Sequence, residues 1–514
     1  MRVIAWAAVI GALVLSLLWP LLLGRLPLYF YDTAVYLFGG GSALYVLGIE
    51  TPYVEGHRVA GAIEATGATT ETAPAGTAAV PQAAPGGEDA VGRGDSAEEG
   101  YSVSLARSPY YGAFLAIAGW MHNLFLAAYA QVALVLVTGF FLLRAVFGER
   151  LMMPAAILIP LGVVTPLAMF TVLLLPDIFA GLGILALVIP FVFAARLGWV
   201  DRVFWFALLV GAVLVHNTHL ALALLLVLPL AFLAGVVLRR PWVPGLVSGG
   251  GAVALGFLSL FAFQQAVQAV YGYKPLSLPM VAATVLLEEP GRTYLEETCP
   301  ENGLIFCDFR DARPTYVDQW LWAPKDFEGV YSWQDVDTKR EMSRQQWSLL
   351  LNVLQHDPLG QLQASLGRFF WQLTEVSIRY VRVDDEVAEA LESRLPPRDL
   401  EPFRASAHYD RTFPIRTLAY GYEVLSLIAA IAGAGLLIWL GRIVRRREGA
   451  AGGLPSAGEM LAFGTALAAG VVVNAAIMGV FSQVQGRYEA RVIWLIGLFV
   501  LLTVAWQVRR RADQ

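Results

Sequence analysis

Long apolar runs separated by short arginine-bearing loops set the pattern of this sequence. The first run, residues 3–23, is too long for the core of a signal peptide and has no small-residue cleavage site before Arg25, so we expect a retained helix. About 20 apolar residues suffice to cross a bilayer, so the pattern predicts an all-α polytopic membrane protein with about ten transmembrane helices. The later runs are 127–147, 152–173, 178–195, 203–216, 218–238, 244–268, 417–440, 457–480 and 492–508.

Prolines interrupt the apolar pattern between residues 152 and 216, where the boundaries of the predicted spans stay open. Proline lacks a backbone N–H and disrupts a helix interior, and broken helices are tolerated at membrane depth where they line a cavity. This stretch therefore favours a cavity within the membrane portion. The prolines concerned are Pro160, Pro166, Pro176 and Pro190.

The charges differ between the two sides of the predicted membrane. If the N-terminus is cytoplasmic, the inward segments carry 14 arginines and five acidic residues, whereas the outward segments 24–111 and 269–416 carry 33 acidic and 20 basic residues. Short cytoplasmic loops carry an excess of basic residues, so we expect both termini to be cytoplasmic. The pattern thus predicts a multi-pass protein of a bacterial inner membrane whose long segments face the periplasm.

The composition narrows the classes of function. Of the 514 residues, 57% are hydrophobic and 15% are charged, and the mean hydropathy is +0.59, which excludes a soluble enzyme. The formal net charge of −5 excludes the strongly basic surface that a nucleic-acid-binding protein needs, so nucleic acid is not an expected partner.

The outward segments predict three kinds of structure. Residues 60–100 are rich in Ala, Gly, Thr and Pro, so we expect a disordered insertion. The aromatic-rich stretches 28–48 and 109–124 suit helices at the outer membrane interface. Residues 269–416, which include two amphipathic patterns at 345–377, predict an α-rich periplasmic domain. This domain separates an N-terminal membrane module at 1–268, with its first periplasmic loop at 24–111, from a C-terminal membrane module at 417–514.

The only two cysteines, Cys299 and Cys307, both fall in the expected periplasmic domain. An oxidising periplasm favours a disulfide between them, and two free thiols are the alternative. Neither cysteine has a metal-ligating neighbour at the usual spacing, so the sequence indicates no zinc site.

Four groups of polar residues fall at the outward ends of the predicted spans. Each has a structural alternative: the aspartates are suited to cap helices, the histidines to lie at the interface, and the arginines to reach lipid headgroups. Two of the arginines share one helical face, where like charges repel unless an anion or a carboxylate lies between them. The groups are Asp32; Asp177; His216 and His219; and Arg487, Tyr488, Glu489 and Arg491.

These groups match the chemistry of transfer from a lipid-linked phosphate. A carboxylate at the water–membrane boundary can take the proton of an acceptor hydroxyl, and guanidinium groups hold a phosphate leaving group and stabilise its charge. Prolines and aromatic interface helices supply a groove for an isoprenoid chain. No cofactor is indicated; a divalent cation stays open, although the sequence shows no acidic cluster of the type that binds hard cations.

The order and sidedness of these residues resemble the GT-C superfamily of integral membrane glycosyltransferases. The resemblance rests on the early Asp32, on Ala-Arg-Ser-Pro-Tyr-Tyr-Gly at 106–112, on Pro-Asp-Ile-Phe-Ala-Gly at 176–181 and on Gly-Arg-Tyr-Glu-Ala-Arg at 486–491. It covers the membrane portion of the chain, outside 269–416. That outer portion, with Asp-Gln-Trp-Leu-Trp after Val317, looks like a group of bacterial membrane proteins and does not name a sugar.

The resemblance implies roles for individual residues. GT-C enzymes use polyprenyl-phosphate-linked sugars on the outer side of the membrane, and their catalytic carboxylate lies in the first outer loop. Asp32 matches that base, and Asp177 would be a second, orienting acid. Many members carry two acids in this loop, whereas here no acidic residue follows Asp32 before Glu50. The remaining roles are contact with the lipid phosphate by Arg487, Arg491, Arg107 and Tyr488, and support by His216, His219 and Tyr110.

The expected function is therefore transfer of a hexose or pentose from a polyprenyl-phosphate donor to a periplasmic glycan, lipid or protein acceptor. The active site would face the periplasm. An O-antigen-type polymerase or ligase is the alternative with the same donor chemistry. A transporter or flippase is the alternative of another class; it predicts ionisable residues in mid-span and two related halves, and neither is visible in the sequence.

Overall fold

The computed structural model describes residues 2–53, 107–237, 239, 241–393, 395–446 and 453–512. Within those residues the fold is all-α, as the sequence predicts, and the only β pairing is a single isolated bridge. The insertion expected at 60–100 lies outside the described residues.

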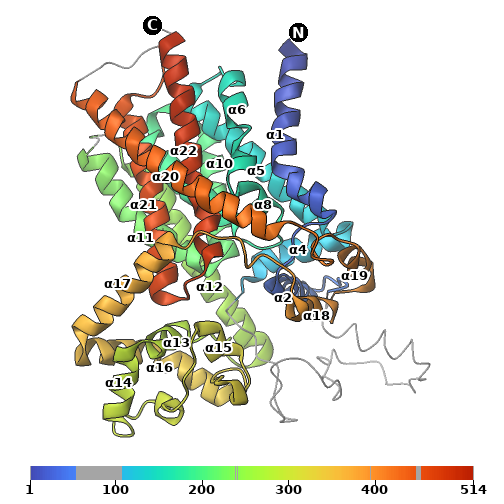
Figure 1. Cartoon of the computed structure of the whole chain (residues 1–514), viewed down its shortest axis with the longest axis vertical. Helices are drawn as coiled ribbons and strands as arrows, with labels where there is room; N and C mark the ends of the chain where they lie inside the picture. The colour runs from blue at the N-terminus through green and yellow to red at the C-terminus, as the bar shows by residue number, and fades with distance from the viewer. Residues whose placement is uncertain are drawn as a thin grey trace.

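Seven of the described helices are long and apolar enough to cross a membrane. Figure 1 shows them gathered in one bundle, with the two chain ends at the same end of it. The chain is therefore a membrane protein with several spans, because a lipid bilayer covers the exposed apolar surface of such helices. The helices are α1 (Arg2–Gly24), α5 (Phe125–Phe147), α11 (Asn217–Phe232) with the π-turn after it, α12 (Val243–Tyr271), α20 (Ile415–Arg445), α21 (Ala457–Phe481) and α22 (Gly486–Ala512).

The other three expected spans are shorter helices. The run at 152–173 is divided at Pro160 and Pro166, where proline supplies no N–H to the helical ladder. The runs at 178–195 and 203–216 form helices of 15 and 17 residues. The elements are α6 (Met152–Leu158), α7 (Leu161–Val164), α8 (Leu167–Val172), α9 (Ile178–Val192) and α10 (Trp199–Val215).

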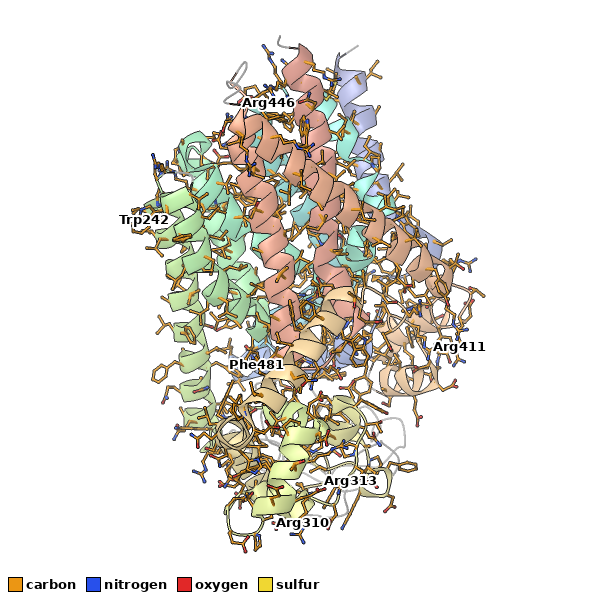
Figure 2. All side chains as sticks on the ribbon, turned by 60° about the vertical axis from the view of Figure 1, so that its left-hand side comes forward. Trp242, Arg310, Arg313, Arg411, Arg446 and Phe481 are labelled. Carbon is orange, nitrogen blue, oxygen red and sulfur yellow. A yellow bond between two sulfur atoms is a disulfide. The ribbon has the colours of Figure 1, made fainter. Side chains whose placement is uncertain are left out.

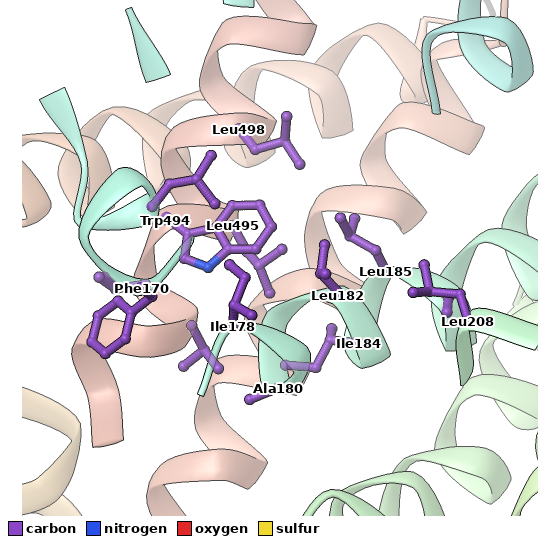
Figure 3. Close-up of a cluster of buried hydrophobic side chains, with 14 of the residues drawn as sticks. Phe170, Ile178, Ala180, Leu182, Ile184, Leu185, Leu208, Trp494, Leu495 and Leu498 are labelled. Carbon is purple, nitrogen blue, oxygen red and sulfur yellow. The ribbon is translucent and has the colours of Figure 1, made fainter. Parts of the chain in front are cut away.

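Helix α9 lies at the centre of the bundle because its sequence is apolar on every side. Figure 3 shows Ile178 and Leu182 of α9 beside Trp494 of α22. Gly181 makes this contact feasible, since a Cβ there would lie 2.5 Å from a carbon of the Trp494 ring. The start of α9 is thus held against the first turns of α22.

Two helices of the first outer segment cross backbone to backbone. They are α2 (Tyr31–Val46) and α4 (Pro109–Met121). A Cβ on Gly40 would come within 1.8 Å of the carbonyl carbon of Gly112, so only glycine permits this approach. The crossing fixes the start of α2 beside the residues that precede α4.

A short extended pairing links the first outer segment to the break after α8. The N–H of Leu28 donates to the carbonyl of Val172 at 3.0 Å, and the N–H of Leu174 donates to the carbonyl of Leu28 at 2.9 Å. Gln131 of α5 satisfies two more groups at this break, donating to the carbonyls of Thr171 and Leu173. Non-helical backbone at this depth is therefore hydrogen-bonded within the protein.

The segment at 269–416 contains two parts. The first has a core of its own, around Phe306, Trp320 and Met342, and includes a disulfide between Cys299 and Cys307. The second packs into the core of the main bundle through Leu391 and Phe403. The first part holds α13 (Met280–Leu287), α14 (Glu289–Thr298), α15 (Val317–Trp322) and α16 (Val336–His356); α17 (Pro358–Thr374) connects it to α18 (Asp385–Glu392) and α19 (Pro397–Arg404) (Figure 1).

Candidate functional site

Asp32 and Arg107 form the more accessible ion pair of the candidate site. Nη2 of Arg107 lies 2.6 Å from Oδ1 of Asp32, and the two side chains are 27% and 16% exposed. Asp32 is in the first turn of α2 and Arg107 stands just before α4, so the crossing at Gly40 and Gly112 brings them together. The carboxylate does not cap α2; Thr33 bonds the backbone of Phe30 instead.

Asp177 lies between Arg487 and Arg491. Its two carboxylate oxygens are 3.4 Å from Nη1 of Arg487 and 3.3 Å from Nη1 of Arg491. All three side chains are buried, so the arginines do not reach toward lipid headgroups. Asp177 precedes α9 without bonding its backbone, so it does not act as a cap either. One carboxylate thus separates two like charges on one helical face.

Aromatic rings and Asn474 complete the surroundings of the two buried arginines. The guanidinium carbon of Arg487 lies 4.3 Å from the ring centre of Phe30, and Tyr488 stacks near both arginines at 5.2 Å. Nη2 of Arg491 donates to Asn474 at 3.0 Å. Within the described residues, Nε of Arg487 and Nε of Arg491 have no hydrogen-bond partner. Each guanidinium therefore keeps a donor that the protein itself does not satisfy.

Glu489 is a further acid of this cluster, to which the sequence assigned no role. It is fully buried, and Nδ2 of Asn474 lies 3.3 Å from its Oε2. Asn474 thus joins Glu489 to Arg491. The spacing of Arg487, Glu489 and Arg491 along one helix start was visible in the sequence, but the burial of Glu489 was not.

Contacts at the start of α2 bring the Asp32–Arg107 pair and the buried arginines near one another: Phe30 lies against Arg487, and Tyr36 lies near Arg107. Burial raises the pKa of Tyr36, and the charges of Arg107, Asp32, Asp177 and Arg487 all act on it. The Tyr36 ring also lies 5.9 Å from the guanidinium carbon of Arg107. The charges of both ion pairs therefore act on the same buried tyrosine.

Asp318 approaches the same site from the outer part at 269–416. Its Oδ2 accepts a hydrogen bond of 3.0 Å from Gln483, in the loop between α21 and α22. Burial raises the pKa of Asp318, the bond from Gln483 opposes this shift, and the charge of Asp32 raises the pKa further. We did not assign Asp318 from the sequence. The available signal was an acid at the start of an aromatic-rich short helix, Asp-Gln-Trp-Leu-Trp.

The two histidines have structural contacts. Nδ1 of His216 accepts the N–H of Thr218 at 3.2 Å and so caps α11. His219 is buried, and its Nδ1 lies 2.9 Å from the carbonyl of Ala212. Their rings lie 5.1 Å apart. Within the described residues, Nε2 of His219 is buried without a hydrogen-bond partner.

A small groove lies beside Arg107, between α4, α10, α11 and α12. Tyr110, expected as a supporting residue, bridges it through a hydrogen bond with Ser259 of α12. Apart from these groups and Asn217, its walls are mostly apolar, and α12 exposes Phe257, Leu258 and Phe261 on its outer face. The groove thus combines one guanidinium with a mostly apolar lining. The lining residues are Arg107, Ser108, Pro109, Tyr110, Val213, Leu214, Asn217, Leu220, Gly256, Ser259, Leu260 and Phe263.

The described residues contain no group of three or more His, Cys, Asp or Glu side chains that could hold a metal ion. The charged groups that the cluster offers a substrate are carboxylates and guanidiniums. Comparison with protein-family models, with curated proteins and with solved structures finds no match for this chain. The geometry of the cluster and its groove is therefore the basis for assigning a function.

Proposed function

We propose that this protein is a GT-C-like membrane glycosyltransferase that moves a sugar from a polyprenyl-phosphate donor to an acceptor hydroxyl. The observation that carries the proposal is the Asp32–Arg107 ion pair beside a mostly apolar groove that Arg107 lines. A lipid-linked sugar phosphate has three parts, and each meets a suitable surface here. Its chain would lie along the groove, its phosphate would contact a guanidinium, and its sugar would approach a carboxylate.

Arg107 is the residue that would contact the donor phosphate first. It is the most exposed of the three arginines, and it lines the groove. Guanidinium binds phosphate through two parallel hydrogen bonds. Arg487 and Arg491, which Asp177 holds in place, would add positive charge from within the protein to stabilise the leaving phosphate.

Asp32 would act as the base of a direct displacement. When the donor phosphate binds Arg107, the Asp32 carboxylate loses its partner and becomes free to accept a proton. It takes the proton of the acceptor hydroxyl while the acceptor oxygen bonds to the anomeric carbon. The bond from that carbon to the phosphate oxygen breaks, and the polyprenyl phosphate leaves with the electron pair. The sugar is transferred with inversion.

The charge distribution supports an orientation with the site on the periplasmic side of a bacterial inner membrane. The last turns of α20 and α22 carry Arg442, Arg445 and Arg509 to Arg511. Figure 2 places Arg446 at the same end, whereas Arg310 and Arg313 lie at the opposite end, with the outer part. Short cytoplasmic loops are rich in arginine, so both chain ends would be cytoplasmic.

The test is a donor-turnover assay on the full chain in lipid nanodiscs. Candidate polyprenyl-phosphate sugars are supplied with acceptor mixtures, and release of the polyprenyl phosphate is followed. We expect Asp32→Asn to reduce turnover by roughly a hundredfold or more, and Asp311→Asn, a change of an exposed carboxylate in the outer part, to leave it unchanged. Turnover that survives Asp32→Asn would overturn the mechanism. Solute flux without turnover of any donor would overturn the transferase proposal in favour of transport.

A further inference from the structure

Helix α17 buries its one charged side chain and two of its three glutamines, and it exposes several large apolar side chains. Among its 17 residues the buried ones are Gln361, Arg368 and Gln372. Arg368 is the only charged residue of the helix, and it is 8% exposed. We call the exposed apolar residues the outward stripe: Leu359 at 77%, Leu362 at 53%, Leu366 at 46% and Phe370 at 59%.

The buried polar side chains bind the loop that leads to the candidate site. Arg368 donates to the carbonyl of Ser482 at 2.6 Å and to that of Thr284 at 3.1 Å. Gln372 donates to the carbonyl of Gln485 at 3.1 Å and accepts from its N–H at 2.8 Å. This polar face is therefore used within the protein and is not available to water.

The outward stripe lies on one helical face, because its residues are spaced by three and four positions. Trp371 widens it at 60% exposed, and Trp347 and Leu351 of α16 extend it at 54% and 57%. A contiguous apolar face of this extent on a membrane protein marks a surface that something else covers.

The stripe continues the bilayer-facing surface of α21. Helix α17 packs along α21, and Figure 2 shows Phe481, at the end of α21, beside it. The rings of Trp347 and Phe481 lie 6.2 Å apart, and Phe481 is 40% exposed. A helix with an apolar face, aromatic residues and no exposed charge is suited to the boundary of the acyl chains. The spanning helix thus connects the stripe directly to lipid.

We propose that α17 lies in the lipid leaflet nearest the outer part, with the outward stripe in the acyl-chain boundary. The leaflet then holds α17, and α17 holds Ser482 to Gln485 through Arg368 and Gln372. The next residues of the chain, Gly486 and Arg487, begin α22 and enter the buried cluster. This inference does not depend on the transferase activity, since it rests on the polarity of α17 and its contact with α21.

The experiment places a spin label at Leu366→Cys, with Leu362→Cys as a second position. Phe327→Cys is the matched control, since Phe327 is a 68% exposed apolar residue elsewhere in the outer part. The native cysteines are joined in a disulfide, so the label attaches to the introduced thiol. In nanodiscs, collisions with oxygen report lipid contact and collisions with a water-soluble nickel chelate report water contact.

We expect both α17 labels to show a severalfold higher oxygen-to-nickel ratio than the Phe327 label. A ratio equal to that of the control would overturn the proposal, because the stripe would then face water. Labels shielded from both reagents would also overturn it, since a second protein chain would then cover the stripe. Substitution at exposed positions leaves the packed core unchanged, so the readout does not depend on refolding.

Discussion

Nη2 of Arg107 and Oδ1 of Asp32 meet at 2.6 Å, although the two residues are 75 positions apart in the sequence. The pair joins a group suited to bind an anion to a group suited to accept a proton. As long as Arg107 holds Oδ1 of Asp32, that oxygen is not free to accept a proton. Binding of an anionic donor would therefore both fill the site and activate it.

The first prediction concerns the geometry of Arg107. Arg107→Lys keeps the charge but loses the planar fork that binds phosphate through two bonds. We expect the KM for the lipid donor to rise by roughly 10- to 150-fold, the equivalent of about 1.5–3 kcal/mol for a hydrogen bond to a charged group. Steady-state turnover with varied donor concentration measures it. Arg313→Lys, in the exposed outer part, is the control, and an unchanged KM in Arg107→Lys would refute the phosphate role.

The second prediction concerns the buried charges around Asp177. Asp177→Asn leaves Arg487 and Arg491 without their common carboxylate, and removal of one partner from a buried ion pair costs about 3–5 kcal/mol. We expect a clear fall in the thermal unfolding midpoint in detergent. Adding Arg491→Met removes one uncompensated charge, so the double variant should recover part of the loss. Equal midpoints for wild type and Asp177→Asn would contradict this account.

The third prediction uses two adjacent glycines of α2. Gly40→Ala places a methyl group against the backbone of Gly112, which cannot move aside without separating α2 from α4. Gly39→Ala meets nothing within 4 Å and should stabilise the helix by about 0.4–1 kcal/mol. Expression level and melting temperature should therefore both fall in Gly40→Ala, and both should hold or rise in Gly39→Ala. If both variants behaved alike, the close crossing of the two helices would be wrong.

The fourth prediction concerns pH and His408, which is buried in the outer segment beside Phe413. Burial lowers the pKa of His408 from 6.5 to about 4. Below pH 6.5 the unfolded chain binds a proton at His408, whereas the folded chain does not bind it until the pH nears 4. Protonation of the unfolded state therefore lowers the free energy of unfolding as the pH falls toward about 4. We expect His408→Gln to flatten the fall in melting temperature between pH 7 and pH 4.5. An identical pH dependence in both proteins would show that His408 protonates freely in the fold.

The membrane character of the fold could be predicted from the sequence because a spanning helix needs a continuous run of about 20 apolar residues. Seven of the predicted runs form helices of sufficient length. The run at 152–173 is broken where Pro160 and Pro166 stand, and those prolines were visible. The backbone pairing at this break could not be predicted, because Leu28 pairs there with a segment more than 140 residues later.

The candidate site could be predicted in its residues but not in its pairings. Asp32, Asp177 and Arg487 stood out because charged residues are costly at the ends of apolar runs. That Asp177 pairs with both Arg487 and Arg491 depends on how α9 packs against Trp494, which no local pattern encodes. Asp318 could not be predicted, because its approach to the site depends on how the outer part docks through Gln483.

The pairing of Asp177 with Arg487 has a consequence for biosynthesis, since 310 positions separate the two residues. At 5–20 residues per second, a ribosome needs roughly 15 to 60 s to add the second residue after the first. Throughout that interval the nascent chain carries the Asp177 carboxylate without its permanent counter-charges. The contacts of Asp177 with Arg487 and Arg491 can form only after the start of α22 has been synthesised. The charge balance at the centre of the bundle is therefore completed only near the end of synthesis.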